Sequence, residues 1–433
     1  NSYSDTGLSA NTSYTYRVRA TDAAGNLSGY SSIASATTQT APTGGTALGN
    51  LAASMAPGTW AELTTNNIGV LNQNGTDGNI ITYGDDAAWD PVSRKFFYIG
   101  NDHIDSVITE TNRFVIYAES TNSWTNMPTP PWSNPGGTDH GNDHHGINPA
   151  TGIMYRREWK DGDRSGMYHI SSDTWTYTSH NTLLTYSQCC AGTDFFPEMG
   201  GLIWAQGGQG ANVGDVFLYT ESTDTWSVIQ RGLPMADYTN LAVYNPVYKI
   251  VLFGRDLALY KLTQTGTITS IGAPPFNIYT GSGWNGNISV DPVSGEYIGM
   301  SSSDTSAPTL WAYNVPSNAW RQLGTRAGWV NHSAIQTPIP TYGVIMYVTC
   351  RATDCHVWLY KHAASSPPPS DTQAPTTPTN LSTTAISSSQ INLSWTQSTD
   401  NVGVTGYRVE RCSGSGCSTF TQVATPSTNS YSD

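Results

Sequence analysis

Short apolar stretches alternate with polar turns through residues 57–362, and the alternation recurs along the chain. In four places a Tyr is followed seven residues later by a Trp, with the Ser, Thr, Asn and Asp that favour turns between them. These pairs are Tyr117/Trp124, Tyr168/Trp175, Tyr219/Trp226 and Tyr313/Trp320. The first three Trp residues stand 51 residues apart, and 94 residues separate the third from the fourth. A period of about 50 residues made of strands and turns predicts a β-propeller, with one degenerate blade ending near residues 267–269.

A turn containing proline precedes an apolar strand once in each predicted blade. The six prolines are Pro91, Pro149, Pro197, Pro246, Pro292 and Pro338. The last predicted blade has no fourth strand after Tyr360, and residues 59–63 supply a suitable strand ahead of the first blade. We therefore expect six blades, closed by pairing between residues 59–63 and the final blade, because closure removes unpaired strand edges.

The repeats resemble those of the kelch family, whose third and fourth strands carry this Tyr-to-Trp spacing. The glycine pair of that family is clear only at Gly207 and Gly208, so the repeat is divergent. The resemblance implies a kelch-like six-bladed propeller.

Period-two alternation also marks both flanks of the repeats. Strands are expected at 391–395, 406–410 and 420–423 near one end, and at 8–20 and 31–38 near the other. These flanks resemble fibronectin type III domains of bacterial secreted proteins. The resemblance is carried by Trp395, residues 400–407, the tyrosine-corner residue Tyr14 and residues 20–26.

The two flanks match that domain in reverse order. Residues 376–433 supply its first strands and residues 1–38 its last strands, and the sequence Asn-Ser-Tyr-Ser-Asp stands at both 1–5 and 429–433. Neither piece buries enough apolar surface to be stable alone. The sandwich domain can be completed in three ways: the two halves pair within one chain, the next chain supplies the missing half head-to-tail, or the sequence is one slice of a longer tandem repeat. A fourth alternative is that the sequence is an arbitrary excerpt. The duplicated strand favours the slice or the head-to-tail contact, because an intramolecular domain needs it once.

The predicted fold class is therefore all-β, a six-bladed kelch-like propeller plus a fibronectin type III β-sandwich split between the two termini. The predicted domains are the last sandwich strands at 1–38, a linker at 39–56, the propeller at 57–362, a Pro/Ser-rich linker at 363–375 and the first sandwich strands at 376–433.

Composition narrows the classes of function. Charged residues are 12% of the chain, against about 25% in ordinary domains, and the formal net charge is −13. A chain so poor in Lys and Arg is a poor partner for nucleic acid. No apolar run approaches the ~18 residues of a membrane span. Aromatic residues at 11% are enough to drive core formation, which argues against disorder.

The cysteines fall in three close pairs, which predict local disulfides and an oxidising, extracellular or cell-surface location. Cys350/Cys355 and Cys412/Cys417 are expected across hairpin tips, and Cys189/Cys190 would form a vicinal bond. Zinc binding is the alternative, but these spacings fit zinc poorly.

Polar residues precede the turn prolines on the predicted innermost strands. The candidate ligand-binding set at the channel mouth is Asp86, Asp143, His144, Asp194, Asn240, Asn287 and His332. Carboxylates and amides there suit a small molecule, a glycan or a cation, with Ca²⁺ the cation that such oxygen ligands favour. The alternative is that polar strand ends are simply hydrated. Trp132, Trp159 and Trp284 are candidates for stacking on sugar rings, or for burial.

Enzyme chemistry finds less support in the sequence. The kelch resemblance invites comparison with galactose oxidase, which needs copper held by Tyr and His and a Cys–Tyr crosslink. Tyr168 and His169 lie in an ordinary predicted third strand, and the cysteines are explained as pairs, so we expect no copper oxidase activity.

The leading prediction is an extracellular structural or adhesive repeat protein. Its units would bind further copies of the chain head-to-tail, as a fibre or surface array. The alternative is a secreted carbohydrate-binding or polysaccharide-active protein that uses the propeller channel.

Overall fold

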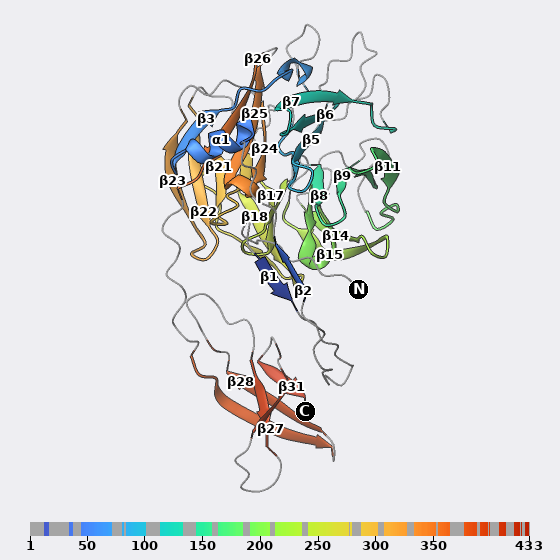
Figure 1. Cartoon of the computed structure of the whole chain (residues 1–433). Coiled ribbons are helices and arrows are strands. Elements are labelled where there is room, and N and C mark those ends of the chain that lie inside the picture. Colours follow the sequence, from blue (N-terminus) through green and yellow to red (C-terminus); the bar gives the residue numbers. More distant parts are fainter. Residues whose placement is uncertain are drawn as a thin grey trace. The chain divides into compact units, whose positions relative to one another are not determined.

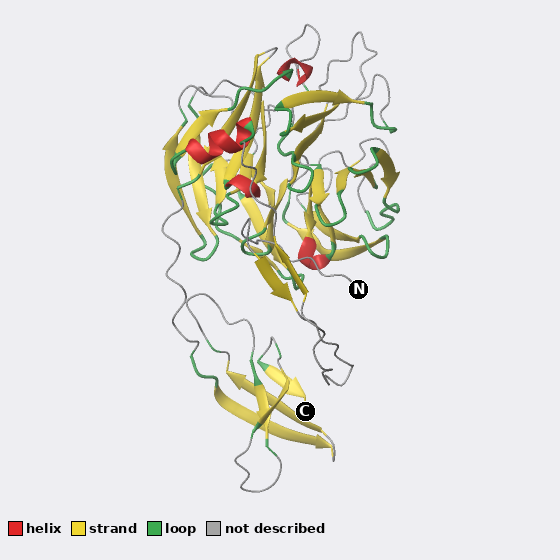
Figure 2. Ribbon diagram, in the orientation of Figure 1, coloured by secondary structure: helices red, strands yellow, loops and turns green. Residues whose placement is uncertain are grey.

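The computed structural model separates the chain into two compact units, Asn1–Ala363 and Ala364–Asp433 (Figure 1). It describes residues 13–16, 34–37, 45–71, 80–81, 84–100, 113–132, 144–157, 163–184, 191–207, 213–235, 241–276, 278, 287–301, 307–326, 333–351, 354–363, 376–387, 390–396, 398, 407–412, 420–424, 426 and 429–432. Strands dominate both units (Figure 2), and among the described residues no helix has the length and hydrophobicity needed to cross a membrane.

The first unit is an all-β propeller, in which the described residues form six four-stranded antiparallel sheets. The first three blades are β4 (Ala88–Asp90), β5 (Lys95–Gly100), β6 (Arg113–Ala118) and β7 (Ser123–Met127); β8 (His145–Asn148), β9 (Ile153–Arg157), β10 (Ser165–His169) and β11 (Thr174–Tyr177); and β12 (Gly192–Phe196), β13 (Gly201–Gly207), β14 (Gly214–Thr220) and β15 (Thr225–Leu233). The next two are β16 (Leu241–Asn245), β17 (Ile250–Arg255), β18 (Ala258–Thr263) and β19 (Ile268–Ser270); and β20 (Asn287–Val290), β21 (Tyr297–Met300), β22 (Thr309–Asn314) and β23 (Ala319–Thr325). The sixth is β24 (Ser333–Ile339), β25 (Val344–Arg351), β26 (Asp354–Lys361) and β3 (Thr59–Glu62). Short 3-10 turns are η1 (Ile68–Leu71), η2 (Pro197–Met199) and η3 (Pro340–Tyr342).

The Tyr-to-Trp spacing follows from the hairpin between the third and fourth strands of a blade. Tyr219 lies directly opposite Trp226, and their ring centroids are 5.2 Å apart. Asp224 in the turn adopts the left-handed backbone with φ of 51°, and its side chain accepts a hydrogen bond of 3.0 Å from the Tyr219 hydroxyl. Asn and Asp tolerate this backbone better than other residues that carry a Cβ, so the turn selects them. The same arrangement recurs at Tyr117/Asn122/Trp124, Tyr168/Asp173/Trp175 and Tyr313/Asn318/Trp320.

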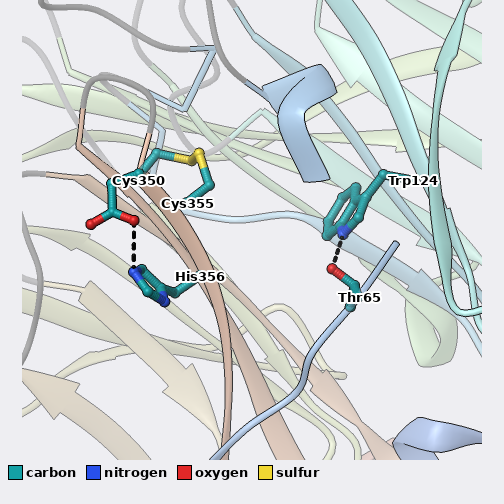
Figure 3. Close-up of a disulfide and its surroundings, with 6 residues drawn as sticks. Thr65, Trp124, Cys350, Cys355 and His356 are labelled. Atoms are coloured by element: carbon teal, nitrogen blue, oxygen red, sulfur yellow. Dashed lines mark hydrogen bonds and ion pairs between the residues drawn. A yellow bond between two sulfur atoms is a disulfide. The ribbon is translucent and has the colours of Figure 1, made fainter. Parts of the chain in front are cut away.

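The predicted closure of the ring is confirmed. β3 pairs with β26, so Trp60 lies opposite Tyr360 and stacks on it with centroids 4.6 Å apart. At the tip of the β25–β26 hairpin, Cys350 and Cys355 form the predicted disulfide, with His356 beside it (Figure 3). The first and last parts of the propeller are therefore joined by backbone hydrogen bonds and aromatic packing.

A helix stands where the sequence predicted only linker. Within residues 39–56, α1 (Ala47–Ser54) is capped by Thr46, whose Oγ1 accepts the amide N–H of Gly49 at 3.1 Å. Leu48 and Ala52 are buried in the core cluster shared with the first and sixth blades. The two apolar positions are four residues apart, too brief a pattern to distinguish this helix from a turn in the sequence.

The second unit contains two small sheets. One holds β27 (Thr379–Ser387), β28 (Gln390–Thr396) and β31 (Ser430–Ser432), and the other β29 (Val409–Arg411) and β30 (Thr421–Ala424). In the first unit, β1 (Ser13–Tyr16) and β2 (Ala34–Thr37) form a separate two-stranded antiparallel sheet.

Candidate functional site

A cavity of about 210 Å³ lies where the innermost strands of the six blades converge. It is lined largely by apolar groups, including turn prolines from five of the blades: Pro91, Pro149, Pro197, Pro246, Pro338 and Pro340. Asp86 and Asp194 line the cavity together with His145 and Gln336. The inner strands bring these residues together because each strand starts near the propeller axis.

Asp86 and His145 connect the first two blades. The Ile99 amide N–H donates to His145 Nε2 at 3.0 Å, so the ring proton resides on Nδ1, which lies 3.0 Å from Asp86 Oδ1 and donates to it. Burial and the nearby Arg156 guanidinium lower the pKa of His145 well below its ordinary value. The imidazole is therefore neutral and holds the Asp86 carboxylate in place.

Burial also raises the pKa of the Asp86 carboxyl well above its ordinary value, and the negative charges of Asp194 and Asp85 add to this. The Arg156 guanidinium and a hydrogen bond from the His145 backbone act in the opposite direction. A carboxyl whose pKa is raised by burial and by neighbouring negative charge favours holding a proton or attracting a cation.

Two adjacent arginines are fully buried behind this wall. Arg156 Nη1 donates to His144 Nδ1 at 2.8 Å, and the Arg157 guanidinium lies over the Trp204 ring, 4.6 Å from its centroid. A buried guanidinium keeps its charge and needs such partners. His144 therefore serves as a buried partner of Arg156, and it is not among the residues that line the cavity.

Asp194 connects the third and fourth blades. Its Oδ1 accepts the Phe195 amide N–H and its Oδ2 accepts the Tyr244 amide N–H, each at 2.7 Å. Burial raises the pKa of Asp194 to about 7, although these two amide hydrogen bonds lower it. The carboxyl therefore changes charge near neutral pH while remaining anchored to the backbone.

Asn287 faces the sixth blade. Its Nδ2 donates to the Ala334 carbonyl at 2.5 Å and to Gln336 Oε1 at 2.6 Å, and Gln336 Nε2 donates to the Ile288 carbonyl at 3.2 Å. Gln336 also accepts the Ala87 amide N–H through its main-chain carbonyl at 3.1 Å. Asn287 thus joins two blades, and Gln336, which the sequence analysis did not select, lines the cavity.

The structure places the predicted site residues in three groups. Asp86 and Asp194 line the cavity together, whereas His144 and Asn287 are buried in contacts between strands or blades. Asp143, Asn240 and His332 lie outside the described residues. Ser289 and Thr337 also line the cavity but were not predicted from the sequence; the available signals were the position of Ser289 two residues after Asn287 and of Thr337 directly before Pro338.

Other candidates can be placed in part. Within the described ranges, no three His, Cys, Asp or Glu side chains gather in a way that could hold a metal ion. Trp132 is 9% exposed and packs edge-on against Trp175 with centroids 4.7 Å apart, so it is a core residue and not a sugar platform. Trp159 and Trp284 lie outside the described residues.

The other two predicted disulfides involve cysteines that the structure describes only in part. Cys412 is disulfide-bonded, whereas Cys417, its predicted partner, lies outside the described residues. Cys189 and Cys190 also lie outside them.

Comparison with known proteins gives short matches only. Over 47 residues the chain is 64% identical to chitinase A1 of Niallia circulans, which covers 11% of this chain and 7% of that protein. Over 96 residues it is 42% identical to exoglucanase B of Cellulomonas fimi, covering 20% and 9%. Over 57 residues it is 40% identical to chitinase Chi52 of Paenibacillus xylanexedens, covering 13% and 11%. The chain thus spans about a tenth of the length of these relatives, and no family model matches it.

Solved structures resemble the chain loosely. A proposed gluconolactonase has a TM-score of 0.43 at 13% identity, covering 71% of this chain and 100% of that one. The mitotic checkpoint complex gives 0.41 at 10% identity, covering 72% and 96%, and the nidogen/laminin complex gives 0.39 at 8%, covering 56% and 79%. The assignment of a propeller fold therefore rests on the six four-stranded sheets of the structure and not on these similarities.

Proposed function

We propose that this protein is an extracellular structural or adhesive repeat unit, joined to further copies head-to-tail by completion of a fibronectin type III-like sandwich. In this proposal the propeller is a kelch-like spacer or display domain. Residues 376–433 provide an incomplete sandwich, and residues 1–38 of the next copy complete it by strand addition.

The observation that carries the proposal is the small core of the second unit. Among its described residues, the buried hydrophobic side chains are Trp395 and Val409, whereas Leu381 is 64% exposed and Phe420 is 59% exposed. A small domain with so little apolar surface buried among its described residues is marginally stable alone. We infer that further strands cover its apolar face.

A cavity of about 620 Å³ lies on the apolar face of the second unit. Leu381, Leu393 and Trp395 line it together with Tyr407, whose ring centroid lies 5.2 Å from that of Trp395 in an edge-on contact. Leu381 is exposed at the rim of this cavity, Leu393 and Tyr407 are half-buried, and an apolar surface of this kind is typical of an interface between partners. The space is of a size that one or two strands can fill.

The duplicated sequence supports the identity of the partner. Tyr431 of β31 lies opposite Leu393 of β28, and the same Ser-Tyr-Ser occurs at residues 2–4. The strands β1 and β2 follow residues 2–4 along the chain and pair with each other as a two-stranded sheet. An isolated two-stranded sheet is marginally stable in water. Both parts therefore gain stability if a copy of one covers the other.

The test uses a substitution that harms only the assembled state. Leu381→Arg places a charge on the exposed wall of the cavity, where it costs the isolated chain little but would be buried in the assembly. Val92→Arg, at a propeller turn where Val92 is 75% exposed, is the matched control. Light scattering over a range of concentrations and electron microscopy measure assembly.

We expect the native chain and Val92→Arg to form concentration-dependent head-to-tail assemblies, and Leu381→Arg to remain monomeric with an unchanged melting temperature of the propeller. A native chain that stays monomeric at every concentration contradicts the proposal. So does a Leu381→Arg variant that assembles like the native chain.

A second candidate function is carbohydrate binding at the cell exterior. Its specific support is that the short sequence matches are to proteins named as chitinases and an exoglucanase. Those names and the Cys350–Cys355 disulfide are compatible with an extracellular location for this chain. Co-sedimentation with insoluble chitin and cellulose tests it, and failure to bind either polymer contradicts it.

A further inference from the structure

The channel cavity contains polar groups that the protein itself leaves unused. Ser289 is 2% exposed and Thr337 is 4% exposed, and both line the cavity. Within the described part of the chain, neither hydroxyl has a protein hydrogen-bond partner. Neither hydroxyl oxygen is fully enclosed, so both are open to the cavity, where a ligand or water can supply the missing hydrogen bond.

The cavity also holds more negative than positive charge at its wall. The Asp86 and Asp194 carboxylates line it, and His145, which also lines it, is neutral. The remainder of the wall is mostly apolar and cannot solvate a carboxylate. A cation that brings its own hydrogen-bond donors would compensate both charges.

From these observations we propose that the channel cavity binds a small primary ammonium compound, held by the Asp86 and Asp194 carboxylates and by the Ser289 and Thr337 hydroxyls. The site does not depend on assembly and involves no strand of the second unit.

The chemistry of the wall favours an ammonium group over other ligands. An –NH₃⁺ group has three donors and no acceptor, which suits two carboxylates and a hydroxyl oxygen. A metal ion would need at least three ligands of suitable type, and no such group occurs within the described ranges. A neutral polyol would leave the two negative charges uncompensated. Burial raises the pKa of both carboxyls, and the Arg156 guanidinium opposes this rise at Asp86 only in part.

The volume limits the size of the ligand. At about 30 Å³ for each water molecule, 210 Å³ is equivalent to about seven waters. This is below the ~300 Å³ at which pockets for drug-sized molecules begin. The apolar wall and turn prolines therefore accommodate a ligand body ranging from two carbons to a single sugar ring.

Calorimetry on the intact chain with a matched ligand pair tests the proposal. Ethanolammonium and ethylene glycol have nearly the same size and differ in the ammonium group. At about pH 8, above the Asp194 pKa, we expect saturable millimolar binding of ethanolammonium and at least about tenfold weaker binding of ethylene glycol. Calcium chloride is titrated as a third ligand.

Four variants assign the binding to this cavity. Asp86→Asn and Asp194→Asn should each weaken ethanolammonium binding about tenfold. Asp256→Asn is the control, because it makes the same change at the exposed turn of the fourth blade, where the backbone φ of 50° suits Asn. Thr337→Val is nearly isosteric and removes one hydroxyl, so it reports on the cavity even where an Asp variant fails to fold.

Binding that weakens in Thr337→Val and in the two cavity Asp variants but not in Asp256→Asn supports the proposal. Equal affinity for ethylene glycol, a preference for Ca²⁺, or ethanolammonium binding unchanged in both Thr337→Val and the folded Asp variants overturns it.

Discussion

The left-handed Asn in the first-blade hairpin allows a quantitative test of how the repeated turn stabilises the propeller. Asn122 has a φ of 50°, and its Oδ1 accepts the Tyr117 hydroxyl at 2.9 Å while its Nδ2 donates to the Thr64 carbonyl at 2.9 Å. Tyr117 is fully buried, so its hydroxyl has little access to water. Replacing Asn122 by Ala perturbs the backbone and both hydrogen bonds at once.

The expected cost of Asn122→Ala is the sum of three effects. Placing Ala in the left-handed region costs about 1 kcal/mol. Leaving the buried Tyr117 hydroxyl without its acceptor costs about 1–2 kcal/mol, and the more exposed bond to Thr64 contributes about 0.5–1 kcal/mol. The total is about 3 kcal/mol of unfolding free energy.

Two further variants separate these effects. Asn122→Gly loses both hydrogen bonds but adopts the left-handed backbone without strain, so it should be about 1 kcal/mol more stable than Asn122→Ala. In the Gly background, Tyr117→Phe should recover stability, because it removes the orphaned hydroxyl. In the native background the same Tyr117→Phe change should destabilise.

The assay is urea unfolding of the intact chain, followed by tryptophan fluorescence, with Trp124 packed against Tyr117 as a local reporter. Equal stability of the Ala and Gly variants refutes the backbone argument. A Tyr117→Phe change with the same sign and size in both backgrounds refutes the hydrogen-bond argument.

Three other changes test different parts of the propeller. Burial raises the pKa of Asp194 from an unfolded value of 3.8 to about 7, so the folded state favours the protonated carboxyl. As the pH rises between those two values, the native chain should therefore lose stability relative to Asp194→Asn. Melting temperatures of both proteins measured against pH test this. Reducing the Cys350–Cys355 disulfide releases a short loop and should lower the unfolding free energy by about 2 kcal/mol, measured by urea titration with and without reductant. Gly192→Ala places a methyl group 2.2 Å from the Leu241 main-chain carbon, so it should cost at least about 1–3 kcal/mol and lower the melting temperature.

The blades could be predicted from the sequence because their markers are local. Tyr219 and Trp226 are fixed opposite each other by a turn whose residues are all visible in the sequence. The pairing of residues 59–62 with the last blade could also be predicted, since one strand was missing at one end and one was in excess at the other. Helix α1 was missed because its stability comes from burial of Leu48 and Ala52 against distant blades and not from its own pattern.

The site was predicted less completely for a physical reason. Side chains near the axis of a propeller face either the cavity or the neighbouring blade, and the choice depends on partners about 50 residues away. His144 and Asn287 found such partners in Arg156 and Gln336, whereas Asp86 and Asp194 kept a face on the cavity. No local pattern in an inner strand distinguishes these two outcomes.

The pairing that closes the ring also determines how mechanical force would pass through the molecule. Thr59 lies opposite Lys361, so the chain enters and leaves the sixth blade at the same end of the β3–β26 pair. Tension applied through the two flanking segments would first pull α1 from the core that it shares with the first and sixth blades, and would then peel β3 from β26 one hydrogen bond at a time, beginning at Thr59. The second to fifth blades lie outside this load path and would stay folded until the pair had opened. Under tension this molecule would therefore extend first at its ring closure, which would re-form when the load is released.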